Sequence, residues 1–144
     1  MPSVSIKGTI ARPLAEVFPF VADCRNDPKW APMVPEVEQI AGDGPGLGAR
    51  YRIKQGVGGG KFTWMELETT HFVEPSELGW AMSTDAMTYR SKMTLASVDG
   101  GTRIKQTNTV TFNSRLRNVI WFLMVRVNLR RQFRRLRAEL EGSD

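Results

Sequence analysis

Residues 114–141 read SRLRNVIWFLMVRVNLRRQFRRLRAELE and contain neither glycine nor proline. Ser114 is a suitable N-cap and Gly142 a suitable stop, so the stretch predicts one helix of about 27 residues, about 40 Å long. Apolar residues recur at steps of three and four, which indicates a buried face, broad in the first half and interrupted once by Arg126. The predicted apolar face comprises Leu116, Val119, Ile120, Phe122, Leu123, Val127, Leu129, Phe133, Leu136 and Leu140.

The sequence before this helix alternates apolar and polar residues with a period of two, which is typical of strands with one buried face. The predicted strands cover about residues 3–10, 33–41, 50–55, 62–73, 78–82, 89–95 and 104–112. Turns rich in glycine at 42–48, 56–60 and 99–101 make neighbouring strands into hairpins. Two short helical segments are predicted between the first two strands, where Pro19, Pro28 and Pro32 prevent a longer helix.

We therefore predict an α+β fold: a curved antiparallel sheet of about seven strands around the long C-terminal helix, with two short helices after the first strand. Residues 1–144 contain no internal repeat, linker or low-complexity segment, so one domain is predicted. A helix lying across a strongly curved sheet need not fill the concavity. The fold thus leaves room for an internal apolar pocket.

Composition excludes several classes of protein. The hydrophobic fraction of 41% and the charged fraction of 24% are near globular averages, which argues against disorder and against a membrane protein. Cys24 is the only cysteine, so no disulfide can form within the chain. The N-terminus lacks the features of a signal peptide, and the longest apolar run, 119–125, is too short to span a bilayer. We expect a cytoplasmic protein.

Positive charge gathers at the C-terminus. Residues 1–113 carry 12 Lys/Arg and 12 Asp/Glu, whereas residues 114–144 carry 8 Arg and 3 acidic residues. Such a helix can meet nucleic acid, an anionic membrane or an acidic partner, although a solvated outer face is the commoner explanation. Arginines interleaved with aromatic residues on a sheet are absent, which makes nucleic acid the weakest of these. Exposed apolar residues on the helix would indicate a homodimer.

Three segments resemble one family: ARPLAEVFPFVADCRNDPKWAP at 11–32, GDGPGLGARYRI at 42–53 and LRRQFRRLRAEL at 129–140. Together with the order of elements, they resemble the START-like (SRPBCC) helix-grip superfamily, in particular its polyketide cyclase/dehydrase-like branch. The resemblance covers nearly the whole chain and implies a sheet that grips a C-terminal helix. Its members include lipid carriers, hormone receptors and aromatic polyketide cyclases, so it specifies fold and leaves chemistry open.

Metal and phosphate sites find little support. The 42–48 turn lacks the Lys-Ser/Thr ending of a phosphate loop and joins two strands. His71 is the sole histidine, and the nearby acidic residues lack the spacing of metal ligands. We predict no metal and no cofactor.

Candidate ligand-binding residues lie on the strand faces expected to point inward, in the 23–32 loop and on the long helix. Buried amides such as Gln106 and Asn108 could satisfy one another, or they could orient the oxygen atoms of a ligand. The loop residues Asp23, Arg25, Asn26 and Asp27 are explained by capping and salt bridges, or by ligand contact. The candidates are Trp30, Tyr51, Trp64, Trp80, Tyr89, Ser91, Met93, Gln106, Asn108, Ile120 and Leu123.

Catalytic candidates are few. The 62–73 strand has apolar residues on both sides, so the pattern does not assign its inward face. If Glu66 faces the cavity, its pKa rises and it becomes the best acid or base. His71 is a weaker candidate, because a histidine near a strand end is more often at the surface.

Three functions follow from these observations. The first is a carrier or sensor for a small hydrophobic ligand such as a lipid, polyketide or aromatic metabolite, held by buried apolar surface and oriented by a few polar groups. The second is a cyclase or dehydratase, which needs an inward acid or base. The third is peripheral membrane association through the arginine-rich helix.

Overall fold

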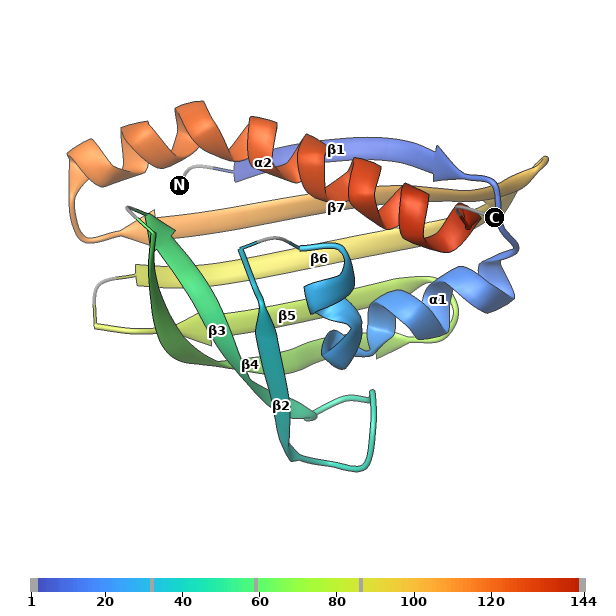
Figure 1. The fold of residues 1–144 in the computed structure, drawn as a ribbon, viewed down its shortest axis with the longest axis horizontal. Helices are drawn as coiled ribbons and strands as arrows, with labels where there is room; N and C mark the ends of the chain where they lie inside the picture. The colour runs from blue at the N-terminus through green and yellow to red at the C-terminus, as the bar shows by residue number, and fades with distance from the viewer. Residues whose placement is uncertain (1–2, 32, 59, 86, 143–144) are drawn as a thin grey trace.

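The computed structural model describes residues 3–31, 33–58, 60–85 and 87–142, without the side chains of residues 57, 58 and 121–123. Seven strands and three helical segments follow one another in the described ranges (Figure 1). The elements are β1 (Ser3–Ile10), α1 (Leu14–Ala22), the 3₁₀ helix η1 (Cys24–Lys29), β2 (Glu36–Ala41), β3 (Arg50–Gly58), β4 (Lys61–Val73), β5 (Glu77–Ser83), β6 (Met87–Val98), β7 (Gly101–Phe112) and α2 (Arg115–Glu141).

The strands form one antiparallel sheet in the order β1-β7-β6-β5-β4-β3-β2, so β1 and β2 are its edges. The β3–β4 hairpin curls strongly away from the plane of β5–β7, and α2 runs over β1 and β7 (Figure 1). The α+β helix-grip architecture is therefore confirmed. Within the described residues, no helix is both long and apolar enough to cross a membrane.

The end of α2 is tied to the segment between β1 and α1. Arg12 donates hydrogen bonds from Nε to the Leu140 carbonyl and from Nη2 to the Glu141 carbonyl, both at 2.9 Å. These carbonyls lack partners inside the helix, and a guanidinium suits the negative end of the helix dipole. The Glu141 carboxylate accepts a hydrogen bond from the Ala11 backbone N–H at 2.8 Å. The C-terminal end of α2 is thus held beside the end of β1.

The other end of α2 is fixed by an asparagine. Ser114 occupies the N-cap position, but its side chain makes no capping hydrogen bond. Asn118 instead accepts from the Phe112 N–H at 2.8 Å and donates to the Phe112 carbonyl at 3.3 Å. One side chain in the first turn of α2 therefore joins the helix to the last residue of β7.

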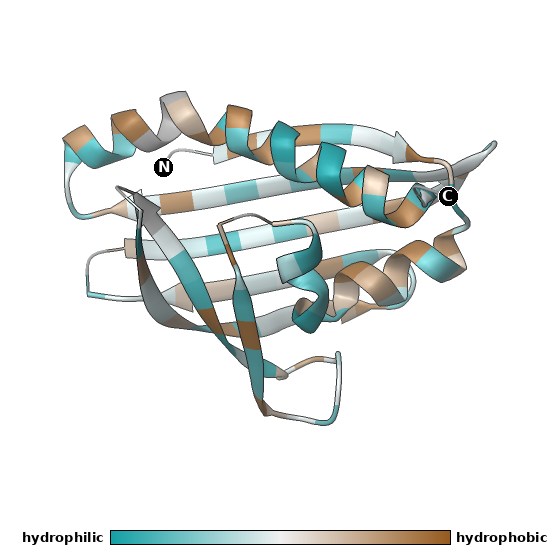
Figure 2. Cartoon of the chain, viewed as in Figure 1, coloured by the Kyte–Doolittle hydropathy of each residue, from teal (hydrophilic) through white to brown (hydrophobic). Residues whose placement is uncertain are grey.

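The broad apolar stripe predicted for the first half of α2 is wrong. Among the helix side chains that the structure describes, the buried ones are Val125, Leu129, Phe133 and Leu136, because α2 presents one narrow face to β1 and β7. Brown and teal bands alternate along α2, with more brown in its first half and more teal in its second (Figure 2). The predicted stripe residues Phe122 and Leu123 fall outside the described side chains. Its exposed members are Leu116, Val119, Ile120 and Val127.

The narrow buried face should carry the energy of helix docking. We expect Leu136→Ala to lower the free energy of unfolding by about 2–5 kcal/mol, because it leaves a cavity at a side chain that is 1% exposed. Leu116→Ala, at a side chain that is 69% exposed on the same helix, should change it by less than about 0.5 kcal/mol. Urea unfolding measures both. Similar losses at the two positions would contradict this docking geometry.

Candidate ligand-binding site

A row of polar side chains crosses the middle of the concave face of the sheet. Thr69 on β4 lies opposite Trp80 on β5, Trp80 lies opposite Ser91 on β6, and Ser91 lies opposite Asn108 on β7. All four residues are buried. Directly opposed residues in an antiparallel sheet share a face and have Cβ atoms about 5 Å apart. The strand register therefore builds a continuous polar belt inside an otherwise apolar core.

One end of this belt is a hydrogen-bonded cluster. Ser91 Oγ donates to Asn108 Oδ1 at 2.7 Å, and Gln106 Nε2 lies 3.3 Å from the same oxygen and 3.5 Å from Ser91 Oγ. The two amides predicted to be buried do lie in the core, and they partly satisfy one another. Their oxygen and nitrogen atoms are held in fixed directions, as recognition of a polar ligand atom requires.

The other end of the belt has unsatisfied polar atoms. In the described part of the chain, the buried atoms Trp30 Nε1, Tyr51 Oη, Thr69 Oγ1 and Trp80 Nε1 have no hydrogen-bond partner of good geometry, although Trp80 interacts with the weakly accepting Cys24 thiol. Tyr51 is inward on β3, diagonal to Thr69, and Trp30 follows η1. Leaving one such group unsatisfied costs about 1–3 kcal/mol. Four of them in one small domain indicate a place that a polar partner fills.

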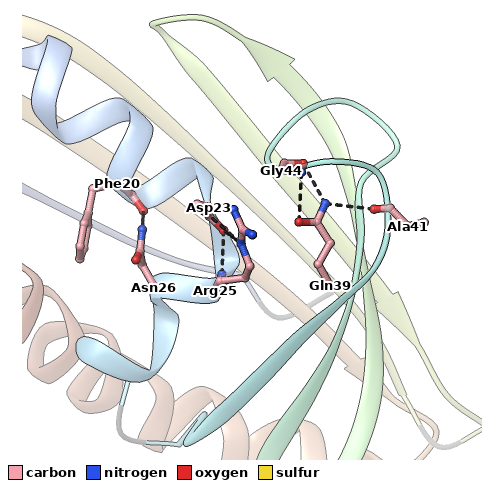
Figure 3. A network of polar contacts seen from close by, with 7 residues as sticks. All are labelled: Phe20, Asp23, Arg25, Asn26, Gln39, Ala41 and Gly44. Carbon is pink, nitrogen blue, oxygen red and sulfur yellow. Dashed lines mark hydrogen bonds and ion pairs between the residues drawn. The ribbon is translucent and has the colours of Figure 1, made fainter.

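The segment η1 and its neighbours cover this end of the sheet. Asp23 caps η1 by accepting from the Arg25 N–H at 3.0 Å, and it also forms an ion pair with the Arg25 guanidinium at 2.7 Å (Figure 3). Asn26 Nδ2 donates to the Phe20 carbonyl at the end of α1. The Arg25 guanidinium lowers the pKa of Asp23 below its usual value. Asp23 therefore stays ionised and holds the cover in place.

Asp27, in the same 3₁₀ helix, has the opposite character. The described residues provide no hydrogen bond or ion pair to its carboxylate, and its pKa is raised well above the usual value, first by burial and then by the charge of Asp23. Burial raises the pKa of Tyr51 and of Tyr89 to about 12, and the Asp27 charge contributes to both shifts. Burial also raises the pKa of Cys24. Asp27 is therefore an unpartnered carboxyl group close to the tyrosines of the concave face.

A hollow of about 940 Å³ opens beside this face. The β4–β5 pairing begins at Glu68 and Ala81, so the first half of β4 separates from the β5–β6 hairpin. The inner side chains Met65, Met82 and Tyr89 line the hollow together with outer residues of β3 and β4. Most of its lining residues belong to the outer face, and the hollow reaches inner side chains at Met65, Met82 and Tyr89.

Most predicted binding residues lie on the concave side of the sheet. Tyr89 is half-buried, and the other inward candidates are buried: Trp30, Tyr51, Trp80, Ser91, Met93, Gln106 and Asn108. One predicted residue cannot contribute there. Ile120 is 46% exposed, because the first half of α2 does not turn that face to the sheet. Leu123 falls outside the described side chains.

The strand β4 places its predicted residues outside. Leu67 and Thr69 are its buried members, so Trp64 and Glu66 point to the outer face, where they line the rim of the hollow. The Arg52 guanidinium stacks on Trp64 at 4.5 Å, and Arg50 pairs with Glu66 at 2.7 Å. The condition for Glu66 to act as an interior acid is not met. His71 is exposed, with its Nδ1 3.2 Å from Thr70 Oγ1.

Sequence reasoning missed Thr69 and gave Asp27 no role of its own. Thr69 could have been found by extending the inward face of the predicted 78–82 strand to its hairpin partner, because Trp80 and Thr69 oppose each other. No local signal separated Asp27 from Asp23. Among the described residues, no group of three or more His, Cys, Asp or Glu side chains could hold a metal ion.

These features define a helix-grip protein of the START-like class, and comparison with solved structures agrees. A START superfamily protein from Mycobacterium smegmatis matches with a TM-score of 0.82 at 14% identity, covering 96% of this chain and 97% of that one. The di-domain ARO/CYC BexL from the BE-7585A biosynthetic pathway matches with a TM-score of 0.79 at 17% identity, over 99% of this chain and 50% of BexL. At these identities, the likeness concerns fold alone.

The family is shown by sequence. Residues 1–141 match the family described as polyketide cyclase / dehydrase and lipid transport, so the chain belongs to that family. No curated protein sequence matches the chain significantly.

The opposite pKa shifts of Asp23 and Asp27 predict opposite pH effects on stability. The folded-state pKa of Asp27 is raised, so ionisation of this group lowers the stability of the fold at pH values above its unfolded pKa. Asp27→Asn should therefore stabilise the protein at pH 7. This gain should vanish as the pH falls towards the usual pKa of 3.8. The folded-state pKa of Asp23 is lowered, so its contribution exists above the unfolded pKa and disappears in acid; Asp23→Asn should destabilise at pH 7. Thermal unfolding of both variants from neutral to acidic pH measures this, and shifts of the same sign would contradict the assignment.

Proposed function

We propose that this domain of residues 1–144 is a cytoplasmic carrier or sensor that binds a small, largely apolar molecule bearing oxygen atoms on the concave face of its sheet. The observation that supports this most directly is the set of four unpartnered polar atoms inside the core. Water could satisfy them individually, but together with the fixed Ser91–Asn108 cluster they form a patterned surface. An oxygenated ligand satisfies several of them at once.

The atoms available limit the chemistry of the ligand. Both indole nitrogens are donors only, and Tyr51 and Thr69 hydroxyls can donate or accept, so the belt favours carbonyl and phenol oxygens. Around it lie apolar walls formed by Leu78, Met82, Met93 and Ile104. Burial against such walls stabilises a bound ligand by roughly 25 cal/mol per Å² of apolar surface. A ring system with a few oxygen substituents fits both requirements.

The family supports the same class of ligand. Its description joins polyketide cyclases and dehydrases with lipid transport, all of which handle apolar molecules bearing oxygen. The hollow between β4 and the β5–β6 hairpin is the proposed entrance, because Tyr89 and Met82 line it from inside.

A second candidate function is proton transfer to or from such a ligand. Asp27 favours it, because desolvation raises the pKa of its half-buried carboxyl group well above the usual value, and perturbed carboxyl groups of this kind serve as general acids and bases. Its neighbours Tyr51 and Tyr89 keep their protons at neutral pH, since each has a pKa of about 12. They can donate hydrogen bonds to an enolate oxygen while Asp27 exchanges the proton on carbon.

Binding is tested by removing one hydroxyl from the belt. We expect Thr69→Val to weaken binding of 1,8-dihydroxyanthraquinone by about 2–10-fold, because one net hydrogen bond contributes about 0.5–1.5 kcal/mol. Binding of anthracene, which has no oxygen, should not change. Ligand-free Thr69→Val should be as stable as the parent or more stable, since its hydroxyl has no partner.

The control is Thr94→Val, at an exposed position on the outer face of β6, which should leave both affinities unchanged. Fluorescence titration gives the affinities, and native mass spectrometry of gently purified protein shows whether an oxygenated molecule copurifies. Equal affinity of Thr69→Val and the parent for both compounds would contradict a role of the belt in recognition.

Proton transfer is tested separately from binding. In D₂O, the protein should accelerate exchange of the acidic C–H of 1-phenyl-1,3-butanedione, and Asp27→Asn should reduce the protein-dependent rate by about 10²-fold or more. Proton NMR measures the exchange, and tyrosine fluorescence checks that the variant still binds. If the parent binds the diketone without accelerating exchange, the protein is a carrier for this class of compound and the enzymatic alternative fails.

A further inference from the structure

The two halves of α2 present different kinds of side chain to solvent. Its first half presents large apolar side chains to solvent, and each is 46–69% exposed. Monomeric proteins rarely expose several large apolar side chains together unless the surface binds something. These residues are Leu116, Val119, Ile120, Met124 and Val127.

The second half of α2 forms a basic groove with β1. Arg126, Arg130 and Arg134 recur every four residues, and they line a hollow of about 520 Å³ together with Lys7. Ser5, Ile6 and Phe133 complete its lining, so no acidic side chain faces the groove. Within the described residues, none of the four cationic groups forms an ion pair. The groove therefore offers uncompensated positive charge to an anion.

The charge pattern of α2 favours an anionic membrane over a second copy of the chain as the partner of this surface. Residues 114–138 contain eight arginines and no acidic residue, and Arg115 and Arg117 place charge at the apolar end as well. In a dimer formed through α2, arginines of one copy would face arginines of the other, which is unfavourable. An anionic bilayer accepts both halves, because apolar side chains enter the acyl boundary while arginines contact lipid phosphates.

We propose that α2 docks this protein on an anionic phospholipid surface, with the apolar half inserted and a lipid phosphate held in the groove of Lys7, Arg126, Arg130 and Arg134. The guanidinium groups suit phosphate because their planar N–H donors match two phosphate oxygens. This surface lies on the outside of the helix and is separate from the polar belt. Docking therefore does not require the internal ligand.

Vesicle sedimentation of the ligand-free protein tests the proposal. The parent should bind phosphatidylcholine vesicles containing phosphatidylglycerol, bind pure phosphatidylcholine much less, and lose affinity at high salt. Replacing Arg126, Arg130 and Arg134 together by Gln should weaken binding by about 100-fold, since each charge near an anionic surface contributes about fivefold. All three side chains are exposed, so the variant should fold.

Two further variants complete the experiment. The matched control replaces Arg90, Arg103 and Lys105, which are exposed on the outer face of the sheet, by Gln; it removes the same charge and should retain most of the binding. Val119→Gln with Met124→Gln should lower affinity for anionic vesicles by about tenfold, and the part lost should be insensitive to salt.

The proposal fails if the control triple variant loses as much affinity as the groove variant, because net charge alone would then explain binding. It also fails if the parent does not bind anionic vesicles, or if sedimentation equilibrium shows a dimer that Val119→Gln with Met124→Gln dissociates. Affinity for 1,8-dihydroxyanthraquinone, measured without vesicles, reports on the polar belt alone. Failure of membrane docking is thus distinguishable from failure of ligand binding.

Discussion

The packing of Phe133 against Gly8 fixes where α2 crosses the sheet, and the remaining features of the molecule depend on it. A Cβ atom at position 8 would collide with the Phe133 ring, so the helix can approach β1 this closely only at a residue without a side chain. With Phe133 seated there and Arg12 holding the end of the helix, α2 lies along β1 and β7. The concave side of β3–β6 must then be covered by other elements, and α1 and η1 take that place.

Because α2 covers β1 and β7 while α1 and η1 cover the rest of the concave face, the polar belt and the outer face of α2 are separate surfaces. Because α2 uses only one narrow face against the sheet, its opposite face keeps apolar and basic side chains in solvent. Because η1 covers the belt, that site is closed by a short 3₁₀ segment held by the Asp23–Arg25 pair. A short element with few contacts opens at lower cost than a long packed helix. The η1 segment can thus open locally while the outer face of α2 stays unchanged.

Sequence periodicity predicted the inward residues of β3, β5, β6 and β7. Polar or charged residues occupy the opposite face of β3, β6 and β7, and small residues alternate with Leu78, Trp80 and Met82 in β5. Periodicity failed for β4, where Trp64 and Met65 are neighbours and both are hydrophobic, so the stacking of Arg52 on Trp64 decides what the pattern leaves open. Periodicity also failed for the first half of α2. A stripe of apolar residues indicates a helix face that favours burial, but it does not show whether a neighbouring element covers that face. The family resemblance gave the fold, and the register was needed to bring Thr69, Trp80, Ser91 and Asn108 together.

The loop before Trp30 shows most clearly why a site needs geometry. Asp23 and Asp27 are both acidic residues in a short polar segment, and capping explains either one from sequence. In the structure, Asp23 accepts from the backbone and guanidinium of Arg25, so the charged form is favoured. Asp27 lies one turn further on and has no such partner among the described residues, and burial together with the charge of Asp23 disfavours its charged form. The ionised residue, Asp23, holds the 3₁₀ segment through its pairing with Arg25. Four residues apart in one segment, the two carboxyl groups have opposite pKa shifts because only Asp23 has an arginine beside it.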